Sequence, residues 1–196
     1  PRLYDVDSGS VTFDGVDVRE LDLAFLRKNV GVVSQETYLF NGTIRDNLQY
    51  ADPEATEEDM INALKKANIY DFVASQEKGL DTEVGNRGLK LSGGEKQRIS
   101  IARVVCRKPE VYIFDDTFSA LDFRTDVEVR KALRRETTGS TTIIVSQRIG
   151  TIMDADRIVV LSEGRIIDTG THDELLSSCA MYREMYESQM SEVTSA

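Results

Sequence analysis

The sequence predicts an α/β domain with a parallel sheet at its core, an antiparallel edge and an inserted α-helical lobe. In the second half of the chain, short apolar strand patterns alternate with helical patterns, an order that favours a parallel sheet. A hairpin pattern opens the chain, and residues 36–90 contain helix-start signals but no long strand pattern. We therefore expect an edge and first core strand over 1–35, the helical lobe over 36–108, the rest of the core over 109–190 and a disordered tail over 191–196.

Composition excludes several classes of protein. The chain has 196 residues with 40% hydrophobic content, enough to bury a core. Its net charge of −10 argues against a nucleic-acid-binding protein, which needs a basic surface. No apolar run reaches the ~18 residues of a membrane helix and the first residues do not resemble a signal peptide, so we expect a soluble chain without a targeting signal. Cys106 and Cys179 lack metal-ligand spacing and are expected to be reduced thiols of an intracellular domain.

Local signals place the elements of the first half. Alternation over 10–13 runs into an Asp-Gly turn and predicts a hairpin. Asp22 is a suitable cap for a short helix, which is followed by an apolar strand over 30–33. In the lobe, Thr43 begins a short helix, and Thr56 begins a longer one with a capping-box pattern.

The octapeptide Leu91-Ser92-Gly93-Gly94-Glu95-Lys96-Gln97-Arg98 opens directly onto a long helical pattern. Glycine lets backbone N–H groups approach a ligand closely, and a helix start offers unpaired N–H groups with the positive end of the dipole behind them. A bare Ser-Gly-Gly is also found at ordinary capped helix starts. The whole octapeptide predicts a site for an anion such as a phosphate.

The second half alternates strands and helices. Apolar runs at 111–114, 141–145 and 157–161 predict strands, and a helix over 124–136 separates the first two. The last strand is expected to form a hairpin through a turn at Gly164.

Polar side chains follow these predicted strands. Gln35 comes after the strand of the first half, Asp115 and Asp116 come after the next one, and Gln147 follows the third. In open parallel sheets ligands bind at the carboxyl ends of the strands, so we expect these side chains to form one site. An aspartate there can hold Mg²⁺ of a bound nucleotide, since Mg²⁺ prefers carboxylate oxygen, although two aspartates after a strand also occur as a loop cap.

Taken in order, these motifs resemble the nucleotide-binding domain of ATP-binding cassette (ABC) transporters of the exporter type, over essentially the whole chain. Gln35 is similar to the Q-loop glutamine, and 111–115 resembles the Walker B strand. Segment 83–88 resembles the one that exporters place before the signature to contact the membrane domains, with Asn86 where a Glu is usual. The remaining matches are Leu91, Ser92, Gly93, Gly94, Glu95 and Gln97 in the signature and Ser119, Ala120, Leu121 and Asp122 in the D-loop.

The resemblance implies a P-loop-NTPase-like fold and an ATP-hydrolysing domain that couples nucleotide binding at a domain dimer interface to transport. ATP and Mg²⁺ are the implied cofactors, with Asp115 and Gln35 at the metal and Asp116, Gln147 and Gln35 at the catalytic positions. The signature would contact the partner's ATP. The implied partners are a second nucleotide-binding domain and the transmembrane domains, at the cytoplasmic face of the cell membrane. Neither nucleic acid nor the transported substrate would be contacted directly.

This sequence departs from the family pattern in three ways. No G-x-x-x-x-G-K-S/T (Walker A) motif occurs in the 196 residues. Asp116 stands where active members carry a glutamate, and Gln147 stands where they carry the switch histidine. We therefore expect the chain alone to be inactive, and its parent to be the degenerate-site half of a heterodimeric exporter.

Two other functions stay open. Asp116 and Gln147 favour a regulatory domain that binds ATP without hydrolysing it. A DNA-repair or chromosome ATPase would share the signature and the Walker B strand, but is expected to carry a coiled coil and basic faces. His172 is expected to begin a helix, and Tyr182 and Tyr186 to form a packing stripe.

Overall fold

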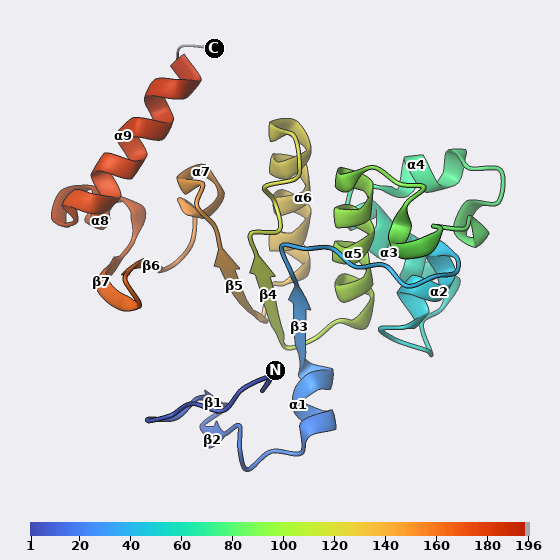
Figure 1. Ribbon diagram of the computed structural model, residues 1–196, viewed down its shortest axis with the longest axis horizontal. Helices are drawn as coiled ribbons and strands as arrows, with labels where there is room; N and C mark the ends of the chain where they lie inside the picture. The colour runs from blue at the N-terminus through green and yellow to red at the C-terminus, as the bar shows by residue number, and fades with distance from the viewer. Residues whose placement is uncertain (195–196) are drawn as a thin grey trace. The chain divides into compact units, whose positions relative to one another are not determined.

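A three-stranded parallel sheet lies in the first of the two compact units into which the chain divides (Figure 1). The structure is a computed structural model that describes residues 1–194. The first unit is Pro1–Val145, and the second begins at Ser146. The expected boundaries at 35/36 and 108/109 both fall inside the first unit and stay a prediction.

The parallel sheet has the order β3-β4-β5 and confirms the predicted core strands. Its strands are β3 (Val30–Val33), β4 (Val111–Asp115) and β5 (Thr141–Val145). Tyr112 and Phe114 are buried on one face of β4. The other face of the sheet carries Val32 of β3 and Ile143 of β5, which are 37% and 47% exposed. An unbroken apolar run such as that of β4 is typical of a strand buried on both faces, but this face of the sheet is partly open. An apolar run alone does not reveal whether a second layer covers the strand.

A short antiparallel hairpin and a capped helix precede the sheet. β1 (Thr12–Phe13) pairs with β2 (Val16–Asp17), as predicted. Helix α1 (Leu23–Asn29) begins where Asp22 accepts a hydrogen bond from the N–H of Phe25 at 2.8 Å. This bond satisfies one of the unpaired donors of the first turn.

The helical lobe lies between β3 and β4 in the sequence. Its elements are α2 (Ile44–Gln49), α3 (Glu57–Lys66), α4 (Tyr70–Ser75), the 3₁₀ turns η1 (Gly79–Asp81) and η2 (Asn86–Gly88), and α5 (Gly93–Arg107). Capping boxes begin α2 at Thr43 and α3 at Thr56, as predicted. Leu48, Leu64 and Ile99 belong to one buried cluster that joins the lobe to the sheet.

Two contacts show how closely the lobe packs on the core: a close approach at a glycine and an ion pair. A Cβ atom on Gly31 of β3 would lie 2.5 Å from Cγ1 of Val104 in α5, so only glycine fits there without a shift. Helix α6 (Phe123–Glu136) follows β4 and is joined to α3 by an ion pair between Glu136 and Lys66.

The second unit has its own core. It contains α7 (Ile149–Ile152), the antiparallel pair β6 (Ile158–Ser162) and β7 (Arg165–Gly170), α8 (His172–Ser178) and α9 (Ala180–Thr194). His172 begins α8, and its Nδ1 lies 2.9 Å from the hydroxyl of the buried Tyr182, as expected for structural residues.

The predicted tail differs from the structure in part. Helix α9 continues to Thr194 because 180–194 contain neither glycine nor proline that would end it. Residues 195–196 of the predicted tail lie outside the described residues. Within residues 1–194, no helix combines the length and apolar character that crossing a bilayer requires.

Candidate functional site

Gln35 and Asp116 meet at the carboxyl edge of the parallel sheet. Gln35 follows β3 and Asp116 follows β4, and these two strands are neighbours. Nε2 of Gln35 donates a hydrogen bond to Oδ2 of Asp116 at 3.1 Å. The structure therefore brings together two residues that are 81 positions apart in the sequence.

The turn after β4 fixes Asp116 from both neighbouring strands. Asp116 has a φ of 43°, in the left-handed region that Asp tolerates better than most residues. Its N–H donates to the carbonyl of Val145 at 2.9 Å. The next residue, Thr117, is fully buried and donates its hydroxyl to the carbonyl of Val33 at 3.0 Å. These bonds hold the Asp116 carboxylate over Gln35.

Asp115 is the last residue of β4, and its side chain is exposed. In residues 1–194 no three His, Cys, Asp or Glu side chains gather into a metal cluster. Mg²⁺ usually needs only one or two carboxylates, with water and phosphate oxygens completing its shell. The exposed Asp115 carboxylate, with the carboxamide of Gln35 after the neighbouring strand β3, fits that requirement.

The signature begins α5 with a reciprocal cap. The N–H of Ser92 donates to Oε2 of Glu95 at 2.7 Å, and the N–H of Glu95 donates to Oγ of Ser92 at 3.3 Å. A Cβ atom on Gly93 would meet nothing within 4 Å, so the space in front of this first helical residue is open. Leu91, just before the cap, is buried and anchors the loop. The backbone at Gly93 is therefore accessible to a ligand from outside this chain.

Gln97 occupies a different environment from the start of the signature. It is 2% exposed; its Oε1 accepts a hydrogen bond from the hydroxyl of Thr37, and its Nε2 donates to the carbonyl of Ser34 at 3.5 Å. Gln97 therefore ties α5 to the segment around Gln35. This burial disagrees with its expected contact to a nucleotide, because the pattern of the octapeptide does not show which side of the helix each residue takes.

The D-loop lies beside the signature. A Cβ atom on Gly94 would lie 3.6 Å from the carbonyl oxygen of Ala120, and Leu121 is buried. Ser119 donates its hydroxyl to the carbonyl of Asp116 at 2.7 Å, which connects the D-loop to the turn after β4. Asp122 caps α6, and hydrogen bonds from Thr125 lower the pKa of its carboxyl.

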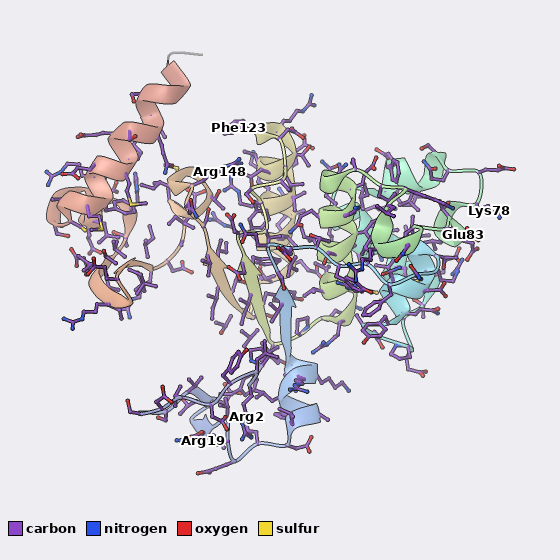
Figure 2. The ribbon with its side chains drawn as sticks, viewed as in Figure 1. Arg2, Arg19, Lys78, Glu83, Phe123 and Arg148 are labelled. Atoms are coloured by element: carbon purple, nitrogen blue, oxygen red, sulfur yellow. The ribbon has the colours of Figure 1, made fainter. Side chains whose placement is uncertain are left out.

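Phe123, the first residue of α6, lies next to this loop (Figure 2). Its side chain is 81% exposed. The end of the D-loop therefore presents an uncovered aromatic ring in this chain.

Segment 83–88 lies against an exposed aromatic surface of the lobe. Glu83, labelled in Figure 2, forms an ion pair with Lys90 at 3.2 Å. The guanidinium of Arg87 lies 6.0 Å from the ring centroid of Tyr38, a cation–π distance. The rings of Tyr38, Phe40 and Tyr50 follow one another at 5.2 and 4.0 Å between centroids, and Tyr50 is 66% exposed.

Gln147 belongs to the second unit, two residues after the end of β5. Its side chain is exposed, and its backbone carbonyl accepts a hydrogen bond from Nε2 of Gln189 at 2.8 Å. The sequence pattern singled out neither Gln189 nor the half-buried Thr37 and the buried Thr117. Thr37 stands two positions after Gln35 and Thr117 directly follows Asp116, and this proximity to predicted site residues is the signal that could have found them.

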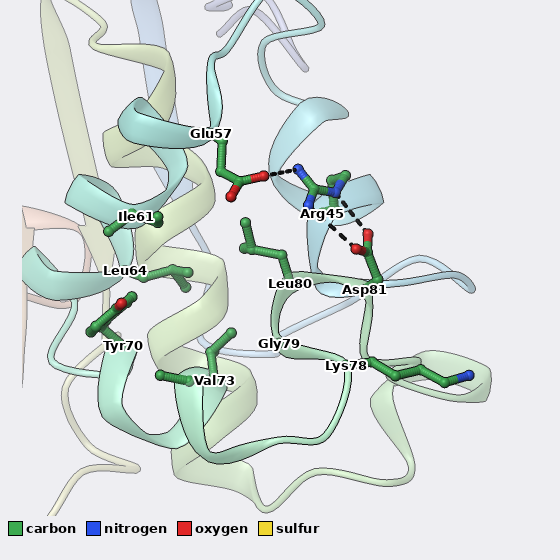
Figure 3. Close-up of a pocket in the computed structure, with 11 residues that line it drawn as sticks. Arg45, Glu57, Ile61, Leu64, Tyr70, Val73, Lys78, Gly79, Leu80 and Asp81 are labelled. Atoms are coloured by element: carbon green, nitrogen blue, oxygen red, sulfur yellow. Dashed lines mark hydrogen bonds and ion pairs between the residues drawn. The ribbon is translucent and has the colours of Figure 1, made fainter.

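A hollow of about 280 Å³ lies elsewhere, in the helical lobe (Figure 3). Arg45 at its rim pairs with Asp81 at 2.7 Å and Glu57 at 3.0 Å, and the bond to Asp81 is the main cause that raises the pKa of Arg45. Leu64 and Val73 line its apolar side. None of the lining residues is a predicted site residue, so the hollow is separate from the edge formed by β3 and β4.

The chain is similar to several transporter proteins. The sequence model of a family described as ABC transporter matches residues 2–119. ABC transporter aclQ of Aspergillus oryzae (strain ATCC 42149 / RIB 40) is 47% identical over 188 residues, which cover 96% of this chain and 23% of that protein. Putative multidrug export ATP-binding/permease protein YgaD of Bacillus subtilis (strain 168) is 45% identical over 189 residues, 96% of this chain and 33% of that protein.

A solved structure shares the fold. The structure of a bacterial Atm1-family ABC exporter with ATP bound gives a TM-score of 0.93 at 42% identity, over 96% of this chain and 33% of that one. The chain thus spans about a quarter to a third of the length of these proteins. The family match covers more than half of the chain, and the fold and the order of motifs agree with it: this chain belongs to the ABC transporter family.

Proposed function

We propose that this chain is the nucleotide-binding domain of an ABC exporter, in which ATP binding between two such domains drives transport of a substrate across a membrane. The hydrogen bond between Gln35 and Asp116, beside the exposed carboxylate of Asp115, is the observation that carries the proposal. The names of YgaD and of the Atm1-family exporter support export as the direction of transport.

Mg²⁺ would be held by Asp115 and Gln35. Gln35 uses its Nε2 toward Asp116, which leaves its carboxamide oxygen for the metal. Bound there, Mg²⁺ would neutralise charge on the phosphates of ATP. Asp116 takes the position next to the attacking water, and Gln147 can donate a hydrogen bond to the γ-phosphate without carrying positive charge.

The signature serves the nucleotide of a second domain. Ser92, Gly93 and Gly94 open α5, where backbone N–H groups and the helix dipole favour an anion, and the space in front of Gly93 is open. The ring of Phe123 at the end of the D-loop is uncovered, as a residue beside such an interface would be in the isolated chain. These features support a dimer of nucleotide-binding domains.

The transmembrane domains are the second class of partner. Segment 83–88 lies beside the exposed rings of Tyr38 and Tyr50, and aromatic side chains with an arginine across them are typical of protein interfaces. In this proposal the chain lies at the cytoplasmic face of the membrane, in contact with those domains. A partner domain at this face would bury these rings.

The site of this chain is proposed to hold ATP more than to hydrolyse it. The Asp116 carboxylate is one methylene shorter than glutamate, and a misplacement of ~1 Å can cost ~10²-fold in rate. Gln147 supplies no cation. The parent would therefore pair with a domain of intact catalytic residues as a heterodimer, and a purely regulatory, non-hydrolytic domain is the second candidate that Asp116 and Gln147 favour.

Turnover of the intact transporter tests the proposal. Gly93→Asp adds a side chain and a negative charge where backbone must approach phosphate, so ATP turnover should fall by ~10²-fold or more. Ala180→Asp is the matched control, because it adds the same carboxylate to the first residue of another long helix, α9. Equal turnover in the two variants would refute a role for the signature in ATP hydrolysis.

A further inference from the structure

The last helix of the chain holds the segment that carries Gln147. Gln189 of α9 donates from Nε2 to the carbonyl of Gln147 at 2.8 Å, and its Oε1 accepts from the N–H of Ile149 at 2.9 Å. One carboxamide thus bonds both ends of residues 147–149, which we call the switch segment.

Apolar packing sets the place of that carboxamide. Tyr182, Tyr186 and Gln189 are spaced i, i+4 and i+7, so they share one face of α9. Tyr182 is buried in the core of the second unit together with Ile149, and Tyr186 packs against the same cluster. The face of α9 that enters the core therefore also delivers the Gln189 carboxamide to the switch segment.

The residue that precedes the switch segment also forms a hydrogen bond with its backbone. Oγ of Ser146 accepts a hydrogen bond from the N–H of Arg148 at 3.0 Å. The side chain of Gln147, in contrast, is exposed. The carbonyl carbon of Gln147 is bonded directly to its Cα. The hydrogen bond from Gln189 to that carbonyl therefore fixes the position of the Cα from which the Gln147 side chain extends.

We propose that Gln189 is a positioning residue for Gln147: its two hydrogen bonds fix the switch segment so that the Gln147 side chain is presented to the γ-phosphate. The proposal rests on the role that the proposed function gives Gln147. It predicts that loss of the Gln189 carboxamide weakens the binding of ATP but not of ADP, because ADP has no γ-phosphate. A residue that only stabilised the fold would affect both nucleotides.

The first measurement is hydrogen exchange by mass spectrometry on the intact transporter without nucleotide. Gln189→Met keeps the length of the side chain and removes both hydrogen bonds. The peptide that contains Ile149 should then exchange on the order of fivefold faster, whereas a peptide from β6 should not change. Glu187→Met places the same side chain at an exposed position of α9 and should leave both peptides unchanged. Unchanged exchange at Ile149 in Gln189→Met would overturn the proposal.

The second measurement is the concentration of ATP and of ADP that half-saturates the site on this subunit. Gln189→Met should raise the value for ATP on the order of fivefold and leave that for ADP unchanged. In a Gln147→Ala background, Gln189→Met should cause no further loss of ATP affinity, because the two residues act through one contact. If the two substitutions lowered ATP affinity additively, or if Gln189→Met lowered ADP affinity equally, the positioning role would be overturned.

The two measurements separate this proposal from the proposed function. If Gln147→Ala alone leaves ATP and ADP binding unchanged, the role of Gln147 toward the γ-phosphate is wrong, and so is positioning for it. The exchange of the Ile149 peptide then still reports whether Gln189 holds the segment. If Gly93→Asp also leaves turnover unchanged, the failure lies with the proposed function as a whole.

Discussion

The carboxamide of Gln35 donates to the carboxylate of Asp116 across the ends of two parallel strands, at 3.1 Å. Asp116 itself lies in a left-handed turn whose N–H is bonded to Val145. The backbone at the catalytic position is therefore held by hydrogen bonds, and Asp116 carries a carboxylate on a short side chain there. These hydrogen bonds fix the position of Asp116, but its side chain remains one methylene shorter than that of glutamate.

Replacing that carboxylate tests whether it is catalytic. Asn tolerates the left-handed turn and can still accept the hydrogen bond from Gln35, so Asp116→Asn should preserve the site. We expect ATP turnover of the intact transporter to fall by much less than the ~10²-fold that a working catalytic group contributes. A loss as large as that of Gly93→Asp would show that Asp116 is a working catalytic residue.

A longer carboxylate together with a side chain that can be positively charged should raise ATP turnover. In the intact parent, Asp116→Glu combined with Gln147→His supplies a longer carboxylate and a group that can carry positive charge. Single-site ATP turnover at this subunit should rise, on the order of tenfold or more. Each single substitution serves as the control, and turnover that stays at the parental level in the double variant would place the defect elsewhere.

The 196-residue chain alone should bind ATP poorly. It contains no Walker A motif, which supplies most phosphate contacts in P-loop ATPases. Titration calorimetry with Mg-ATP should show no tight site, and a dissociation constant in the low micromolar range would contradict this. The exposed face with Val32 and Ile143 should also make the chain only marginally stable.

Gly31 should be required for packing between β3 and α5. A Cβ there would lie 2.5 Å from Cγ1 of Val104 and 2.8 Å from Cγ of Pro109. Gly31→Ala should therefore lower the free energy of unfolding by about 1–3 kcal/mol, measured by urea denaturation. Gly150→Ala is the control, because a Cβ on Gly150 meets nothing within 4 Å. Equal stability of the two variants would contradict the close packing.

Asp59 should make stability depend on pH in the acid range. Hydrogen bonds from the Lys108 ammonium and from Thr56 lower the pKa of Asp59 from 3.8 to about 2. A lowered pKa in the folded state means that the stabilisation is fully present above about pH 4 and is lost as the pH falls toward 2. The difference in urea midpoint between the parent and Asp59→Asn should therefore shrink between pH 5 and pH 3. A difference that is independent of pH would contradict the assignment.

Much of the fold followed from local sequence signals. Capping boxes at Thr43, Thr56 and Ser92 act within one helical turn, so the residues that start α2, α3 and α5 are readable without any tertiary contact. Asp22 and the Asp-Gly turn placed α1 and the first hairpin for the same reason. The positions of Gln35 and Asp115 also followed, because strand ends of a parallel sheet lie on one edge.

Only the tertiary structure decided the environment of the individual side chains. Thr117 bonds the carbonyl of Val33 and Thr37 bonds Gln97, across 84 and 60 residues, and no local pattern encodes such pairs. The octapeptide predicted an anion site that includes both Gly93 and Gln97, but packing buries Gln97 and leaves the space at Gly93 open. Short-range hydrogen bonding makes helix starts and turns legible in the sequence, whereas burial depends on which distant elements pack together, and that is set only when the chain is folded.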